Sequence, residues 1–393
     1  MKHSKSQTSE MSYIRQKRTA MNTHHETYQN SKKIEELESI RGLAALLVVF
    51  FHIPKWNPIL NIGIINNGYL MVEVFFVLSG FVIFNAYTNK INTSKDLFRF
   101  QFLRFGRLYP IHLTFLLFFL VLEVAKYIAT IKLGVHDIRS TPFAKNNLIA
   151  LIQQIFLAQG IGPTGNASTF NSPAWSTSVE FYTYLIFGLS ILLFRQQKKY
   201  IFFIVAFVSI ALLVTQNTYG FKEFLRCLGG FFIGCLTASV IKKIKIKLPS
   251  YSSALLFISI ILFLQLKSSN DFNIAIYFLT SALITTIMLS NGGVVKNILK
   301  HKILVWLGQM SYSVYMSHTF VLWVISNIFK RILKRPELQN LVGEFTLQLT
   351  TLDTYAAILV IIFFVVLVSW VTYLKIEKPM REKSRRFAFS KLN

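Results

Sequence analysis

Residues 68–87 have the sequence GYLMVEVFFVLSGFVIFNAY, a twenty-residue apolar run that contains one charged side chain, Glu73. About 20 apolar residues in an α-helix cross the roughly 30 Å hydrocarbon core of a bilayer. The stretch therefore predicts a membrane-spanning helix with a carboxylate about one and a half turns from its outer end. A lone carboxylate at that depth must be protonated or paired.

The composition extends this prediction to the whole chain. Of 393 residues, 53% are apolar and only 15% are charged, with a mean hydropathy of +0.48, whereas a soluble domain carries about a quarter charged residues. We predict an all-α polytopic membrane bundle of about ten spans. The predicted spans are 38–54, 68–87, 108–130, 178–195, 199–216, 223–241, 250–267, 272–290, 303–329 and 354–375.

The basic residues give the orientation. The chain has 42 Lys and Arg against 17 Asp and Glu, a net charge of +25. On a soluble protein this excess would suggest nucleic acid, but 30 of the 42 fall in the predicted inner segments when the N-terminus is cytoplasmic. This bias follows the positive-inside rule, so we expect both termini inside and no nucleic-acid partner. Four outer cations form one exception, KRILKR at 330–335.

The remaining segments divide the chain. Residues 1–33 are polar and lack the apolar core of a signal peptide, so we expect a disordered cytoplasmic tail. Residues 34–382 form the predicted transmembrane domain, and 383–393 a basic cytoplasmic tail. The segment 147–159 is too short to span and is expected at the interface or folded back. Two cysteines exclude a disulfide scaffold and a Cys-rich metal site. We expect no metal and no permanently bound cofactor.

Ionisable residues inside spans are functional candidates. Arg41 and His52 stand eleven residues apart in the first span, which places them about 20° apart around the helix and about 16 Å apart along it. The alternative is that Arg41 extends to the cytoplasmic headgroups while His52 lies at the opposite interface. Arg104 and Arg107 are an i, i+3 pair that suits bidentate phosphate binding. Ordinary positive-inside anchoring also explains this pair.

Polar residues in later spans add to this set. Glu180 and Tyr184 share a helix face, and Trp175 and Ser176 precede them at the interfacial entry. Arg226 lies near the outer end of the sixth span, where one alternative is that it neutralises an outer carboxylate. The ninth span contains a polar stripe that hydrogen bonding between helices could also explain. The stripe consists of Ser311, Tyr312, Tyr315 and His318.

The candidate charges sort by predicted depth. Those placed near the outer leaflet are His52, Glu73, Glu180 and Arg226. Those placed near the inner leaflet are Arg41, Arg104 and Arg107. A cavity with a phosphate-binding cytoplasmic mouth and an acid–base outer end would suit group transfer across the membrane.

Seven motifs, in order along nearly the whole chain, resemble the acyltransferase-3 family of membrane O-acyltransferases. They are RGLAALLVVFFH (41–52), GYLMVEVFFVLSGF (68–81), RFGRLYP (104–110), WSTSVEFYTY (175–184), RCLGGFFIG (226–234), GQMSYSVYMSH (308–318) and EKP (377–379). Two departures occur: Glu73 stands where the family more often has Asp, and Phe105 and Gly106 replace an additional adjacent Arg.

The resemblance implies an acyl-CoA donor, most often acetyl-CoA, bound at the inner mouth by Arg104 and Arg107 with Arg41. It implies a sugar hydroxyl of a surface glycan as the acceptor, in a multi-pass protein of the bacterial inner membrane. His52 would act as general base or transient acyl carrier, with Glu180 or Glu73 orienting its ring.

The resemblance gives the other candidates supporting roles. The tyrosines and His318 would line the passage or bind the acyl carbonyl, and Trp175 and Ser176 would position substrate. Some relatives carry a C-terminal SGNH hydrolase-like domain, whereas this chain ends 14 residues after Pro379. We therefore expect it to work as a membrane domain alone or with a separate partner.

Two questions stay open at this level. The runner-up function is a transporter or flippase for a lipid-linked sugar, which inverted repeats would favour, and we find none in the sequence. Acceptor choice is expected to reside in the loop 133–177 and the shorter outer loops. The basic segment 330–335 could meet an anionic glycan, or it could be a solvated loop.

Overall fold

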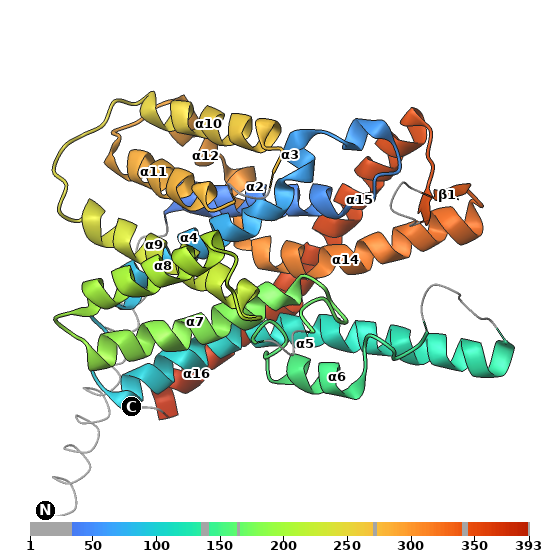
Figure 1. The fold of residues 1–393 in the computed structure, drawn as a ribbon, viewed down its shortest axis with the longest axis horizontal. Helices are drawn as coiled ribbons and strands as arrows, with labels where there is room; N and C mark the ends of the chain where they lie inside the picture. The colour runs from blue at the N-terminus through green and yellow to red at the C-terminus, as the bar shows by residue number, and fades with distance from the viewer. Residues whose placement is uncertain (1–33, 135–140, 163–165, 270–272, 340–344, 392–393) are drawn as a thin grey trace, which may run out of the picture. The chain divides into compact units, whose positions relative to one another are not determined.

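The computed structural model describes residues 34–134, 141–162, 166–269, 273–339 and 345–391. The predicted tail at 1–33 lies outside them, and residues 36–393 form one compact unit. Figure 1 shows this unit to be built almost wholly of helices. Within the described residues, five helical stretches are long and apolar enough to cross a bilayer: Gly68–Tyr87, Ser94–Lys132, Ala174–Leu193, Lys222–Ile241 and Thr351–Ser390. With the shorter apolar helices, they indicate an integral multi-pass membrane protein.

The helices follow the predicted spans closely. The longer elements are α2 (Glu35–His52), α4 (Met71–Tyr87), α5 (Ser94–Leu133), α7 (Ala174–Leu193), α8 (Lys198–Val214), α9 (Lys222–Ile241), α10 (Ser252–Leu266), α11 (Ala275–Leu289), α14 (Ser311–Asn327), α15 (Thr351–Thr372) and α16 (Lys378–Lys391). Shorter helices are η1 (Pro58–Leu60), α3 (Gly63–Asn66), η2 (Gly68–Leu70), α6 (Leu148–Ile155), α12 (Val294–Leu299) and α13 (Lys302–Gln309). Two π-helical turns, η3 (Ile328–Ile332) and η4 (Tyr373–Glu377), continue α14 and α15.

Two helices are longer than predicted. α5 has 40 residues, so the predicted span 108–130 and most of the segment before it, from Ser94 on, belong to one helix. Thr93 and Asp96 form a capping box at its start, and Gly134 ends it in the left-handed conformation. α15, η4 and α16 run without a break from Thr351 to Lys391, so part of the predicted basic tail is helical.

Other details differ from the predicted all-helical pattern. The predicted ninth span, 303–329, is broken at Met310, where the backbone leaves the helical region between α13 and α14. A short antiparallel hairpin pairs β1 (Glu337–Gln339) with β2 (Phe345–Leu347) in the outer segment before α15. The short segment predicted at the interface contains α6, whose Leu148 and Ile149 are exposed.

Glycines bring α4 and α9 into close contact. A Cβ at Gly80 would meet the Phe231 carbonyl, and one at Gly234 would meet the Val77 carbonyl. Lipid tails are as apolar as leucine, so helices in a bilayer associate mainly through such close packing. This contact fixes α4, and with it Glu73 and Ser79, against the rest of the bundle.

Replacing Gly80 by valine is therefore expected to force α4 and α9 apart and to lower stability by about 2–5 kcal/mol. Thermal denaturation of the detergent-solubilised protein measures this loss. Gly292→Val is the matched control, because a Cβ at Gly292 meets nothing within 4 Å. Equal denaturation temperatures for the two variants would contradict this account of the contact.

Candidate active site

Two histidines from different helices meet inside the bundle. His52 ends α2, and His318 lies in α14. Their ring centroids are 4.8 Å apart in an edge-on arrangement. His318 is fully buried, and neither of its ring nitrogens makes a well-aligned hydrogen bond within the described part of the chain. His318 was expected to line the passage or bind the acyl carbonyl, and the structure places its ring directly against that of His52.

A backbone carbonyl fixes the tautomer of His52. Its Nδ1 lies 2.9 Å from the Val48 carbonyl oxygen, one turn earlier in α2. A carbonyl can only accept a hydrogen bond, so Nδ1 carries the proton and Nε2 of the neutral ring keeps its lone pair. The structure differs here from the prediction that Glu180 or Glu73 orients the ring. Both carboxylates have other partners.

Glu180 belongs to a hydrogen-bonded group deeper in the bundle. It accepts hydrogen bonds from Ser79 Oγ at 2.6 Å and from Tyr184 OH at 2.5 Å. It also lines one small cavity together with Arg41. Glu180 lies about two turns from the start of α7, and the hydrogen-bond partners there are Ser79 and Tyr184 rather than His52.

Arg104 lies beside this group. Its guanidinium donates to Tyr87 OH at 2.9 Å and lies over the rings of Tyr87 and Tyr184, at 5.1 and 5.9 Å from their centroids. Such stacking holds the planar group in one orientation while leaving some of its five N–H donors available. Arg104 is partly exposed.

Arg107 and Arg41 complete a basic cluster on α5 and α2. Arg107 interacts electrostatically with Glu180 and Glu377, and Arg41 with Arg107 and Glu180. Both arginines are partly exposed, whereas Glu377 is buried and accepts a 2.7 Å hydrogen bond from Ser313. The three arginines predicted to hold the donor are thus brought together, and Glu38 is a further carboxylate near Arg41 and Arg107.

A cavity of about 40 Å³ lies between this cluster and the histidines. Its lining includes Arg41, Glu180, Ser176, Ser311, Tyr312 and Tyr315. Tyr312 donates to the Leu108 carbonyl at 2.6 Å, which ties α14 to α5. Tyr315 OH is bonded to Ser176 and to the Pro173 carbonyl, and its ring centroid lies 5.9 Å from that of His318. The predicted polar stripe of α14 therefore connects the arginine cluster to the histidine pair.

Glu73 and Arg226 form a separate buried ion pair. Their closest atoms are 2.5 Å apart, and the Arg226 guanidinium lies 4.6 Å from the Trp175 ring centroid. The interpretation of Arg226 as the neutralising partner of an outer carboxylate is confirmed. The pair lines a second, polar pocket of about 460 Å³, together with Tyr69, Lys222 and Tyr277. Trp175 is thus a packing partner of Arg226 rather than of the histidines.

Sequence reasoning missed several residues that complete these groups. Ser79 and Tyr87 were read as ordinary members of an apolar span, and Glu377 only as part of a motif. Each hydrogen-bonds or interacts with a candidate residue more than 15 positions away. The one available signal was that Ser79 is a polar side chain in a mostly apolar run.

Comparison with known proteins gives the family of the chain. The sequence model of the acyltransferase-3 family, described as an acyltransferase domain, matches residues 34–374. Protein 2 in the picA locus of Rhizobium radiobacter is 30% identical over 39% of this chain and 79% of its own length. No solved structure matches.

Two named acyltransferases are also similar. Peptidoglycan O-acetyltransferase OatA of Listeria monocytogenes is 26% identical over 44% of this chain, and acyltransferase MdmB of Streptomyces mycarofaciens is 30% identical over 40% of it. The matched regions span 26% and 39% of those two proteins. With the family model matching most of its length, this chain belongs to the acyltransferase-3 family of membrane acyltransferases.

Proposed function

We propose that this protein is an O-acetyltransferase that moves an acetyl group from cytoplasmic acetyl-CoA to a sugar hydroxyl of a surface glycan outside the membrane. The observation that carries the proposal is the fixed tautomer of His52, whose basic Nε2 stands beside a buried second histidine. The partial match to a peptidoglycan O-acetyltransferase supports acetyl as the group and a glycan as the acceptor.

The proposed topology has about ten spans with both termini in the cytoplasm, in a bacterial inner membrane. This orientation puts the arginine cluster at the cytoplasmic side and the histidine pair nearer the outer side. Arg104, Arg107 and Arg41 would bind the phosphates of CoA, because guanidinium groups bind phosphate bidentately. The thin pantetheine arm would extend past Tyr315 toward His52, and the small cavity there would have to widen to admit it.

In the simplest form of the chemical step, His52 acts as the general base. Nε2 takes the proton of the acceptor hydroxyl while that oxygen forms a bond to the thioester carbonyl carbon. Collapse of the tetrahedral intermediate breaks the C–S bond, and the imidazolium returns its proton to the CoA thiolate. The Val48 carbonyl stabilises the N–H at Nδ1 throughout. If His52 instead carries the acetyl group, Nε2 bonds to the thioester carbonyl carbon while the C–S bond breaks and CoA leaves as the thiolate. In a second step the acceptor oxygen bonds to that carbon, the bond to Nε2 breaks, and the hydroxyl proton neutralises the thiolate.

Label transfer in proteoliposomes tests the proposed function. The protein is reconstituted in both orientations. Acetyl-CoA with a labelled acetyl group is supplied on one side of the membrane, and a peptidoglycan-derived glycan on the other. We expect label on glycan hydroxyls, released by mild base as O-esters are. A flippase would move glycan without attaching label, and that result would contradict the proposal.

Replacing Arg104 by glutamine is expected to raise KM for acetyl-CoA about 10- to 100-fold with a smaller change in kcat, because a charge-assisted contact to phosphate contributes about 1.5–3 kcal/mol. Initial rates at varied acetyl-CoA measure the effect. Lys245→Gln, which removes an exposed cation between α9 and α10, is the matched control. An unchanged KM in the Arg104 variant would remove this residue from the donor site.

A further inference from the structure

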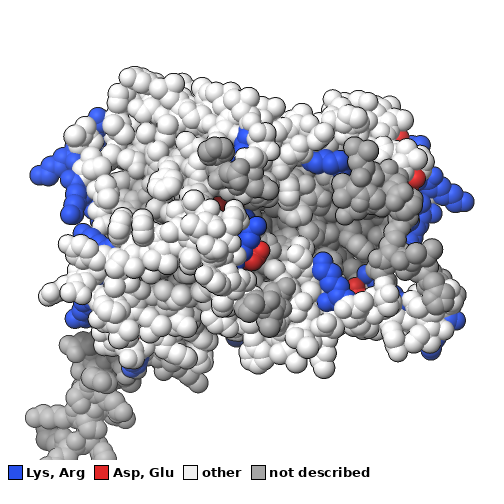
Figure 2. All heavy atoms as spheres, in the orientation of Figure 1, with Lys and Arg blue, Asp and Glu red and all other residues white. Residues whose placement is uncertain are grey.

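A pocket of about 560 Å³ opens at the outer end of the bundle. Its walls come from the outer end of α5, the end of α14 with η3, the segment after α2, and the β1–β2 hairpin. Figure 2 shows the surface hollowed between the ends of α5 and α14, with Lys and Arg atoms on the walls. The proposed acetyl transfer assigns no role to this pocket.

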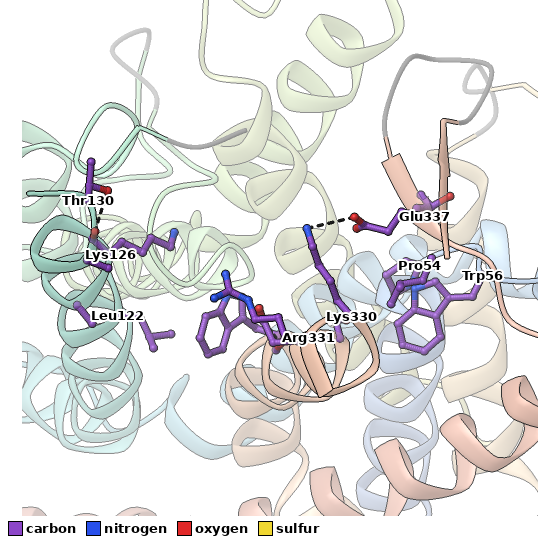
Figure 3. A pocket seen from close by; sticks show the side chains of 15 residues that line it. Pro54, Trp56, Leu122, Lys126, Thr130, Lys330, Arg331 and Glu337 are labelled. Atoms are coloured by element: carbon purple, nitrogen blue, oxygen red, sulfur yellow. Dashed lines mark hydrogen bonds and ion pairs between the residues drawn. The ribbon is translucent and has the colours of Figure 1, made fainter. Parts of the chain in front are cut away.

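Cations face the pocket from two walls. Lys126 comes from α5, and Lys330 and Arg331 come from η3; Figure 3 shows Lys126 and Arg331 extending toward each other across the space. Lys126 pairs with Glu123 at 2.9 Å and Lys330 with Glu337 at 3.2 Å. Arg331 makes no ion pair with any residue that the structure describes. Like charges that face each other across a cavity favour an anion between them.

The rest of the lining suits a saccharide. Trp323 lines the pocket and is 37% exposed, so it offers a ring face against which the CH groups of a sugar can pack, whereas Trp56 is buried in the pocket wall. Ser326 and Asn327 add hydrogen-bonding groups from the same helix turn. A few polar groups on a partly apolar wall are the usual composition of a small-molecule site.

The pocket lies directly outward of the histidine pair along two elements. Pro54 and Trp56 follow His52 by two and four residues, and Trp323 lies five residues beyond His318, about 7.5 Å further along α14. The backbone that positions each histidine therefore continues into a wall of this pocket.

We propose that this pocket binds the acceptor and selects a saccharide that carries an anionic group, a carboxylate or a phosphate, held by Arg331 with Lys126. The assignment as acceptor site rests on the proposed acetyl transfer. The segment 330–335 is thus a binding element rather than a solvated loop. An anionic lipid headgroup is the competing ligand, but the cations face one another inside a cavity and not outward from a helix.

Binding without acyl donor tests this proposal independently of catalysis. The full chain is placed in nanodiscs of zwitterionic lipid, and dissociation constants are measured by microscale thermophoresis. The carboxylate probe is trigalacturonate, with its methyl ester as the uncharged counterpart. The phosphate probe is maltose 6′-phosphate, with maltose as its counterpart. The variants are Arg331→Gln and, as matched control from the same basic segment, Arg335→Gln, whose side chain pairs with Asp353 at 3.0 Å and is not part of the pocket lining.

We expect at least one charged probe to bind more tightly than its uncharged counterpart, and Arg331→Gln to weaken that binding about tenfold. Arg335→Gln should leave it unchanged. Equal binding of charged and uncharged probes, or equal losses in the two variants, would overturn the proposal. The proposal would also be overturned if, in nanodiscs that contain phosphatidylglycerol, Arg331→Gln weakened the binding of that lipid but not the binding of the charged saccharide probes. If the charged probes bind but no label is transferred to glycan, the acetyltransferase function is refuted, while the proposed binding site is still supported.

Discussion

Replacing His52 by alanine is expected to lower acetyl transfer by about 10²–10⁴-fold, the usual contribution of a general base. Nε2 is the atom lost, because the contact of Nδ1 with the Val48 carbonyl commits the other nitrogen to donation. The O-acetyl content of glycan from cells, and label transfer in proteoliposomes, measure the effect. His301→Ala, which removes an exposed histidine between α12 and α13, is the matched control.

Retention of more than half the activity by the His52 variant, with the protein present in the membrane, would contradict its catalytic assignment. A second measurement separates the two chemical roles of this residue. Incubating the wild type with labelled acetyl-CoA and no acceptor should leave label on the protein only if His52 carries the acetyl group. If the His52 variant acquires no label under the same conditions, His52 is the site of attachment.

Replacing Glu73 by glutamine is expected to destabilise the protein by about 3–5 kcal/mol, because the Arg226 cation would remain in a mostly buried site without its counter-charge. Arg226→Gln should lower the stability by less, because the Glu73 carboxyl group left behind can bind a proton, whereas a guanidinium group cannot release one. The double variant should recover most of the loss.

Thermal denaturation of the purified protein in detergent measures these differences. Lys222→Gln is the matched control, because it removes an exposed cation from the same helix and the same pocket lining. Additive losses in the double variant would show that the 2.5 Å contact contributes nothing through pairing.

Much of the architecture could be predicted because hydrophobic length is a local property. The ranges of α4, α9 and α15 lie within a few residues of the predicted spans. The continuation of α5 through residues 94–107 could not be predicted from the sequence. The helix in this stretch depends on a capping box and on packing against α16. There a Cβ at Gly106 would meet the side chain of Ser384, so the close approach of α5 and α16 requires a glycine.

The pairing of the candidate residues could not be predicted from the sequence. Helical periodicity places Arg41 and His52 on one face, yet it says nothing of which residues of other helices face them. Glu180 or Glu73 was therefore expected to orient His52, although Glu180 hydrogen-bonds to Ser79 and Tyr184, and Glu73 pairs with Arg226. The orienting group of His52 was sought among carboxylates, because a backbone carbonyl has no signature in sequence.

The length of α5 has a consequence for the path of the substrates. At about 60 Å, this helix is twice as long as the hydrocarbon core is thick. Arg107 and Lys126 lie about 28 Å apart along it, so under the proposed function the phosphates and the glycan would each remain in hydrated surroundings at opposite surfaces. Only the acetyl group and its slender carrier would then enter the low-dielectric interior, and the energetically costly crossing by a polar sugar would be avoided.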